Sequence, residues 1–170
     1  MALDSAPRDG AFAEKGHQQM ALWDQLRQRS QDMSGQLKTK ANQFKNKDFK
    51  NASMAMCALI AAADGSVDQS ERAKVAGLIT SNDVLSIFPA GELREQFDHY
   101  CTKLTSDYDF GKVEAIQAIA KLKPKQDQAR AVIQIGIIIG GADGNFDADE
   151  RTAVRDACFA AGIAPSEFDL

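Results

Sequence analysis

One sequence frame occurs twice in this chain, and it limits the folds open to the chain more than any other feature. Each copy begins with an apolar run, continues with the pattern Ala-Asp-Gly-x-φ-Asp-x-x-Glu-Arg, where φ is apolar, and ends in a helix-forming segment. The two patterns, ADGSVDQSER and ADGNFDADER, occupy residues 63–72 and 142–151. We interpret the frame as an internal duplication of a buried helix, an acidic loop and a second, capped helix.

Helical periodicity extends through the rest of the chain. It is clearest where apolar residues follow an i, i+4, i+7, i+8, i+11 pattern, which places Leu93, Phe97, Tyr100, Cys101 and Leu104 on one helix face. The isoleucines of residues 126–142 are typical of a strand, but their place in the repeated frame favours a helix. No segment alternates as a strand does. We therefore predict an all-α fold, a compact single-domain bundle of about seven helices with an internal two-fold repeat.

The beginning of the chain differs in composition from the remainder. Residues 1–19 are rich in small and polar side chains, and we expect a disordered extension before a helical domain at residues 20–170. Within residues 17–43, which are mostly helix formers, Met20, Trp23 and Leu26 form one narrow apolar stripe. No signal peptide is visible, and the longest apolar run is far shorter than the roughly 20 residues that span a bilayer. These features predict a cytoplasmic protein.

Charge is distributed unevenly along the chain. Residues 1–50 carry 9 Lys and Arg against 6 Asp and Glu, whereas residues 51–170 carry 11 against 18. An acidic body argues against non-specific binding of nucleic acid, which needs a basic face. The basic part interleaves lysines with two phenylalanines, either as a solvated face with two core anchors or as a contact for an anionic surface such as the inner leaflet. These residues are Lys38, Lys40, Phe44, Lys45, Lys47, Phe49 and Lys50.

Helix capping explains several acids of the two loops without any ligand. Asp68 and Glu71 have the three-residue spacing of a capping box, and so do Asp147 and Glu150. Acids in the first turn also interact favourably with the helix dipole. On this interpretation the loops are only polar connections between helices.

Asp64 and Asp143 are different, because each follows a buried helix and faces the negative end of its dipole. An Asx-turn could explain an Asp before Gly, but a bound cation would explain it better because it would neutralise the acids of the loop together. Carboxylates, the Asn145 amide and backbone carbonyls are ligands for Ca²⁺, Mg²⁺ or Mn²⁺. The loops are not EF-hands, which need Gly at position 6 and Glu at position 12. Metal binding and capping both remain open.

An enzyme is hard to build from this sequence. It contains no P-loop, no GxGxxG and no GxSxG. His17 lies in the expected extension, and His99 lies beside an apolar helix face. Cys57, Cys101 and Cys158 are far apart among apolar neighbours, so we expect buried small side chains and neither a disulfide nor a redox pair. We predict a protein that is not an enzyme and has no organic cofactor.

Five segments resemble the tellurite resistance protein TerB family in order and spacing. They are FKNKDFKNASMAMC, ADGSVDQSER, SDYDFGKVEAIQAIAKLKPKQDQA, ADGNFDADERTAVRD and the ending GIAPSEFDL. The likeness covers about residues 35–170, and Ala164 stands where the family's last motif commonly has Asp. The resemblance implies a bacterial all-helical stress-response protein of the cytoplasm, which works with an integral membrane partner of the TerC type at the inner membrane. It also implies divalent-metal binding, carried over by position to Asp64, Asp68, Glu71, Asp143, Asp147 and Glu150.

We therefore expect a non-enzymatic, metal-responsive interaction module for tellurite resistance. The alternative is a metal-free helical scaffold whose acids only cap helices. A third hypothesis, an enzyme acting on tellurium oxyanions, is disfavoured because reduction would need paired thiols or a redox cofactor motif.

Overall fold

The computed structural model describes residues 41–170, which contain helices and turns but no strand. The predicted all-α class is therefore confirmed, with six α-helices and three short 3₁₀ helices in the described part of the chain. In order these are η1 (Ala41–Phe44), α2 (Lys47–Ala61), α3 (Gln69–Ser81), η2 (Leu85–Ile87), α4 (Ala90–Ser106), α5 (Tyr108–Ala120), α6 (Gln126–Gly140), α7 (Ala148–Ala161) and η3 (Pro165–Phe168).

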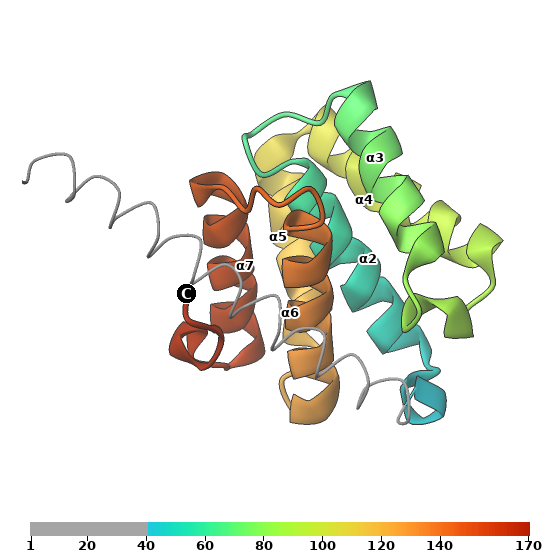
Figure 1. Cartoon of the computed structure of the whole chain (residues 1–170), viewed down its shortest axis with the longest axis vertical. Coiled ribbons are helices and arrows are strands. Elements are labelled where there is room, and N and C mark those ends of the chain that lie inside the picture. The colour runs from blue at the N-terminus through green and yellow to red at the C-terminus, as the bar shows by residue number, and fades with distance from the viewer. Residues whose placement is uncertain (1–40) are drawn as a thin grey trace, which may run out of the picture.

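Helices α2 and α6 form the centre of the molecule. Eleven of the 15 residues of α2 and ten of the 15 residues of α6 are buried, because both helices become almost entirely apolar after a polar first turn. The two helices pack side by side and run in the same direction (Figure 1). They approach closely at Gly136, where an added Cβ would lie 2.8 Å from the Met56 side chain. The isoleucine-rich segment is thus a buried helix, as its place in the frame predicted.

The remaining helices surround this pair. Helices α3 and α4 lie on one side of α2, α7 lies at the far side next to α6, and α5 packs against α2, α4 and α7 (Figure 1). The predicted repeat is visible as α2–loop–α3 and α6–loop–α7. Because α2 and α6 are parallel neighbours, both acidic loops emerge at the same end of the central pair (Figure 1).

Local signals account for most helix boundaries. Asn46 caps α2 by accepting a hydrogen bond from the Phe49 N–H (2.9 Å), so the helix begins at Lys47. Asp107 caps α5 in the same way, and Gly162 ends α7 in the left-handed conformation with φ of 71°. All five residues of the apolar stripe predicted on α4 are buried.

Helix α5 buries a different face from the one its largest apolar residues suggest. Phe110 and Val113 are 76% and 52% exposed, whereas Gly111 and Ala115 are buried. A Cβ at Gly111 would lie 2.6 Å from the backbone nitrogen of Leu104, so α4 and α5 are in backbone contact there. This close approach brings Gly111 and Ala115 inward and leaves Phe110 and Val113 at the surface, whereas Ile119 near the end of the helix is buried.

Several expectations about the first 40 residues lie outside the described part of the chain. They are the extension at residues 1–19, most of the helix at 17–43, and the roles of Lys38 and Lys40. Within the described part, the phenylalanines of the basic segment are buried and Lys45 and Lys47 are exposed, as in a solvated face with core anchors. No helix among residues 41–170 is long and apolar enough to cross a membrane.

Candidate cation site between the two acidic loops

Each acidic loop begins with an Asx-turn that follows a central helix. The Asp64 carboxylate accepts hydrogen bonds from the backbone N–H of Ser66 (3.1 Å) and from its hydroxyl (3.2 Å). The Asp143 carboxylate accepts one from the backbone N–H of Asn145 (3.0 Å). The glycine after each aspartate has a positive φ, 93° in the first loop and 80° in the second. The Asx-turn considered as an explanation for these two acids is therefore present.

Each loop ends with the predicted helix cap. Asp68 accepts a hydrogen bond from the Glu71 N–H (2.8 Å), and Asp147 accepts one from the Glu150 N–H (2.8 Å). In the second loop the Glu150 side chain also accepts a bond from the Asp147 N–H at 3.4 Å, which completes a capping box. Capping at these positions is confirmed, and any ligand role comes in addition to it.

The two loops share one cavity of about 170 Å³, although their acids are 79 positions apart in sequence. Apolar residues from the C-terminal ends of α2 and α6 and from the middle of α3 also line it. Five of the six acids considered as ligands line the cavity, and Asp68 does not. The charged and amide residues lining it are Asp64, Glu71, Lys74, Asp143, Asn145, Asp147 and Glu150.

A lysine that sequence reasoning did not single out joins the two halves of this cavity. The ammonium of Lys74 on α3 donates a hydrogen bond to Asp143 Oδ2 at 2.6 Å and forms an ion pair with it. That contact raises the pKa of Lys74 and lowers the pKa of Asp143. Lys74 lies one helical turn after Glu71, whereas the matching position of the second frame is Ala153. This break in the repeat is the signal that could have identified it.

Glu150 is the acid whose protonation the site perturbs most. Partial burial raises its pKa to about 8, and the neighbouring carboxyl of Asp147 and the charge of Asp143 add to the effect. The side chain packs closely against the start of the second loop, since a Cβ at Gly140 would lie 3.1 Å from Glu150 Oε2 and 2.8 Å from the Phe146 ring. A half-buried carboxyl in this position retains its proton near neutral pH.

The chemistry of the lining fits a hard divalent cation, but its arrangement does not yet form a coordination shell. Carboxylate and amide oxygens are the donors that Ca²⁺, Mg²⁺ and Mn²⁺ prefer. Among residues 41–170, however, no three His, Cys, Asp or Glu side chains are grouped closely enough to hold a metal ion. The positive charge that the lining residues themselves supply is the ammonium of Lys74. A divalent ion would therefore have to displace Lys74 from Asp143 and draw the carboxylates together.

The other titratable candidates lie away from this cavity. Cys57, Cys101 and Cys158 are buried free thiols, and burial raises the pKa of each, to about 11 for Cys101 and about 12 for Cys158. Such thiols are poor nucleophiles. His99 forms an exposed pair with Glu114 at 2.8 Å. The interpretation of these residues as packing or surface side chains is confirmed.

A model of the family described as tellurite resistance protein TerB matches residues 50–170. The chain belongs to the TerB family. A relative, the tellurium resistance protein TerB of Alcaligenes sp, is 29% identical over 118 residues, which is 69% of this chain and 97% of the relative. No solved structure matches the chain. The matched region contains both acidic loops, so the shared cavity lies entirely within the part of the chain that the family model covers.

Proposed function

We propose that this TerB-family protein serves tellurite resistance as a non-enzymatic interaction module whose conformation responds to a divalent cation. The observation that carries the proposal is the convergence of both acidic loops on one cavity. Neither capping nor Asx-turns require the two loops to face each other. One shared site also gives the internal duplication a role, because both copies supply oxygen donors to it.

In this proposal Lys74 and the cation compete for the carboxylate of Asp143. Its ammonium neutralises Asp143 in the ion-free protein, where the cavity would otherwise hold several unpaired carboxylates. A divalent ion would replace one positive charge with two and recruit Asp64, Glu71 and Glu150 in addition to Asp143. Binding would release the Glu150 proton, so affinity rises as the pH approaches about 8 and levels off above it.

The mechanical consequence follows from where the ligands are attached. Glu71 and Glu150 lie in the first turns of α3 and α7, whereas Asp64 and Asp143 follow the ends of α2 and α6. A shared ion would fix the angle of each outer helix relative to the central pair. We propose that a protein partner of the resistance system, such as an integral membrane protein of the TerC type, recognises the resulting surface. Lys45 and Lys47 would then contact the inner face of the cytoplasmic membrane.

A metal-free scaffold is the second candidate function, and specific contacts favour it. Asp64 and Asp143 hold Asx-turns, and Asp68 and Asp147 hold helix caps without any ion. On that account the Lys74–Asp143 ion pair only holds α3 against the second loop. The two accounts differ in whether added cation stabilises the fold.

The discriminating experiment is thermal unfolding of chelator-treated protein with Ca²⁺, Mg²⁺, Mn²⁺ or Zn²⁺ added. A ligand at 100 times its dissociation constant stabilises by about 2.7 kcal/mol, which shifts the melting temperature of a protein this size by several degrees. We expect one of the hard cations to produce this shift, and a variant with both Asp64→Asn and Asp143→Asn to lose it. If no ion stabilises the wild type, the scaffold account holds and the cation proposal is wrong.

A further inference from the structure

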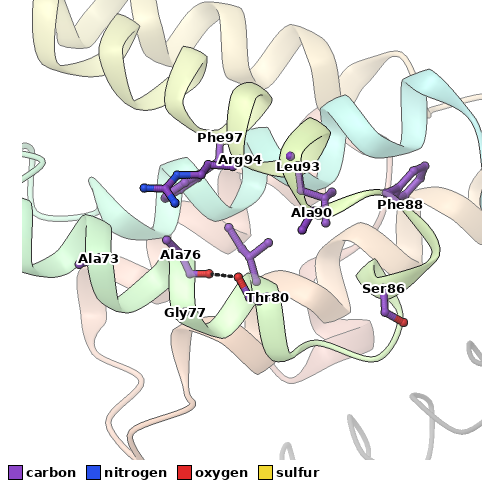
Figure 2. A pocket seen from close by; sticks show the side chains of 12 residues that line it. Ala73, Ala76, Gly77, Thr80, Ser86, Phe88, Ala90, Leu93, Arg94 and Phe97 are labelled. Atoms are coloured by element: carbon purple, nitrogen blue, oxygen red, sulfur yellow. Dashed lines mark hydrogen bonds between the residues drawn. The ribbon is translucent and has the colours of Figure 1, made fainter.

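A second and larger hollow lies on the opposite side of α3 from the cation cavity. It is an open groove of about 850 Å³ between α3 and α4, closed at one end by the segment that carries Phe88 (Figure 2). Its walls are mostly apolar and built from small residues. The lining residues are Ala73, Ala76, Gly77, Ile79, Thr80, Ser86, Phe88, Ala90, Gly91, Leu93, Arg94 and Phe97.

The groove exists because α3 is only loosely covered. Of its 13 residues, only Val75 and Ile79 are buried. Ala73 and Gly77 are exposed on the groove side, and a Cβ added at Gly77 would meet no atom within 4 Å. Small residues facing an open apolar space leave room for bulky side chains from elsewhere.

We propose that residues 20–26 of the same chain occupy this groove, with Trp23 as the anchor. The apolar stripe of Met20, Trp23 and Leu26 would extend about 9 Å along a helix, and the α3 wall from Ala73 to Thr80 extends about 10 Å. Large side chains on the segment would complement small ones in the wall. An aromatic anchor in a small-residue pocket is a common way for a helix to dock.

The position at which the described chain begins supports an occupant from this chain. Phe44 of η1 contacts Phe49 with ring centroids 5.2 Å apart, and Phe49 stacks on Phe88 at 6.2 Å. Phe88 also lines one end of the groove. The first described residues are therefore linked to that end of the groove through Phe49. In this proposal residues 27–40 would serve as a tether, and 14 residues reach about 46 Å when fully extended. The tether also contains Ser34-Gly35, a dipeptide typical of turns, where the chain could reverse direction.

Charge also matches between the groove and the segment. The exposed Arg94 side chain extends along the groove beside Phe97 (Figure 2), and it forms no ion pair with any residue between 41 and 170. Asp24 follows Trp23 directly in the segment. Docking would give Arg94 both a carboxylate partner and an indole face on which to stack.

The test uses the single tryptophan of the chain as a contact reporter. Thr80→Cys in the full-length protein is labelled with bimane, a fluorophore that an indole ring quenches on contact. The native thiols Cys57, Cys101 and Cys158 are buried and should not label under native conditions. We expect bimane emission several-fold lower in this protein than in the same protein carrying Trp23→Phe. Because Trp23 and the bimane label are on the same chain, quenching should not change when the protein is diluted.

A label at Phe159→Cys is the matched control, since this residue of α7 is 68% exposed and does not line the groove. Its emission should be the same with and without Trp23→Phe. The proposal is overturned if the Thr80 label is equally bright in both proteins. It is also overturned if quenching disappears on dilution and returns on mixing with unlabelled wild type, because the occupant would then be a second copy.

The native fluorescence of Trp23 tests the same docking without a dye that could itself alter the groove. Gly77→Phe places a bulky side chain in the groove at a position where the added Cβ itself meets no atom within 4 Å, and Gly77→Ala adds a single carbon at the same site. Native Trp23 emission should move to longer wavelength, and acrylamide quenching should rise, in Gly77→Phe but not in Gly77→Ala. Identical spectra for wild type and Gly77→Phe would contradict docking of Trp23 at this site.

Discussion

Replacement of Glu150 by Gln tests the electrostatics of the shared cavity in the ion-free protein. Glutamine keeps the shape of the side chain and its capacity to accept the capping hydrogen bond from Asp147, but it cannot ionise. In wild type, burial and the neighbouring acids raise the pKa of Glu150 from 4.5 to about 8. Proton binding to Glu150 therefore stabilises the folded state fully below about pH 4.5, and this contribution is lost as the pH rises through about 8.

The magnitude follows from the pKa change and the partial exposure of the carboxyl. A fully buried group with this change would contribute about 5 kcal/mol. Glu150 is only half-buried, and solvent screening reduces the expected contribution to on the order of 1–2 kcal/mol. We therefore expect wild type to lose about 1–2 kcal/mol of stability relative to Glu150→Gln between pH 5 and pH 9.

Urea unfolding at a series of pH values in chelator-containing buffer measures this difference directly. The free energies of the two proteins should agree near pH 5 and diverge as the pH rises, with the Gln variant the more stable at pH 9. Glu71→Gln, the counterpart on α3, controls for the loss of any acid from the cavity. Parallel pH profiles for wild type and Glu150→Gln would refute the reasoning about this carboxyl.

Three further substitutions test separate parts of the structure. Gly111→Ala should lower the free energy of unfolding by about 1–3 kcal/mol, because its Cβ would lie 2.6 Å from the Leu104 backbone. Gly77→Ala should raise it by up to about 1 kcal/mol, because the site is open and alanine favours a helix; urea unfolding measures both. Lys74→Met should tighten the binding of a divalent cation by roughly two- to fivefold in a titration, because an exposed ion pair such as Lys74–Asp143 contributes up to about 1 kcal/mol to the ion-free state.

Features set by neighbours in sequence were predictable. The caps at Asp68 and Asp147 and the buried stripe of α4 depend only on spacing along a single helix, and each is present. The likeness of 126–142 to its counterpart in the first frame correctly outweighed the strand preference of isoleucine. Asn46 shows the limit of this kind of reasoning, because it caps α2 from within a segment that we interpreted only by its lysines and phenylalanines.

Features that depend on packing between distant segments were not predictable from spacing. Both loops share one cavity because α2 and α6 are parallel neighbours, which no local pattern reveals. The Lys74–Asp143 pair joins residues 69 positions apart. Likewise, the backbone contact with Leu104 places Gly111 inward, while the larger Phe110 and Val113 on the same helix stay exposed. Sequence spacing identified the acids of each loop separately, and the fold was needed to show that five of them line one cavity with Lys74.

Isothermal titration of chelator-treated protein with the stabilising cation tests the central claim, that the two loops form one site, most directly. We expect one ion per chain, with Asp64→Asn alone and Asp143→Asn alone each weakening binding markedly, because each loop supplies part of the same shell. Two ions per chain, each abolished by only one of the two substitutions, would mean two independent loops. Absence of binding by any of Ca²⁺, Mg²⁺ and Mn²⁺ would contradict the account altogether.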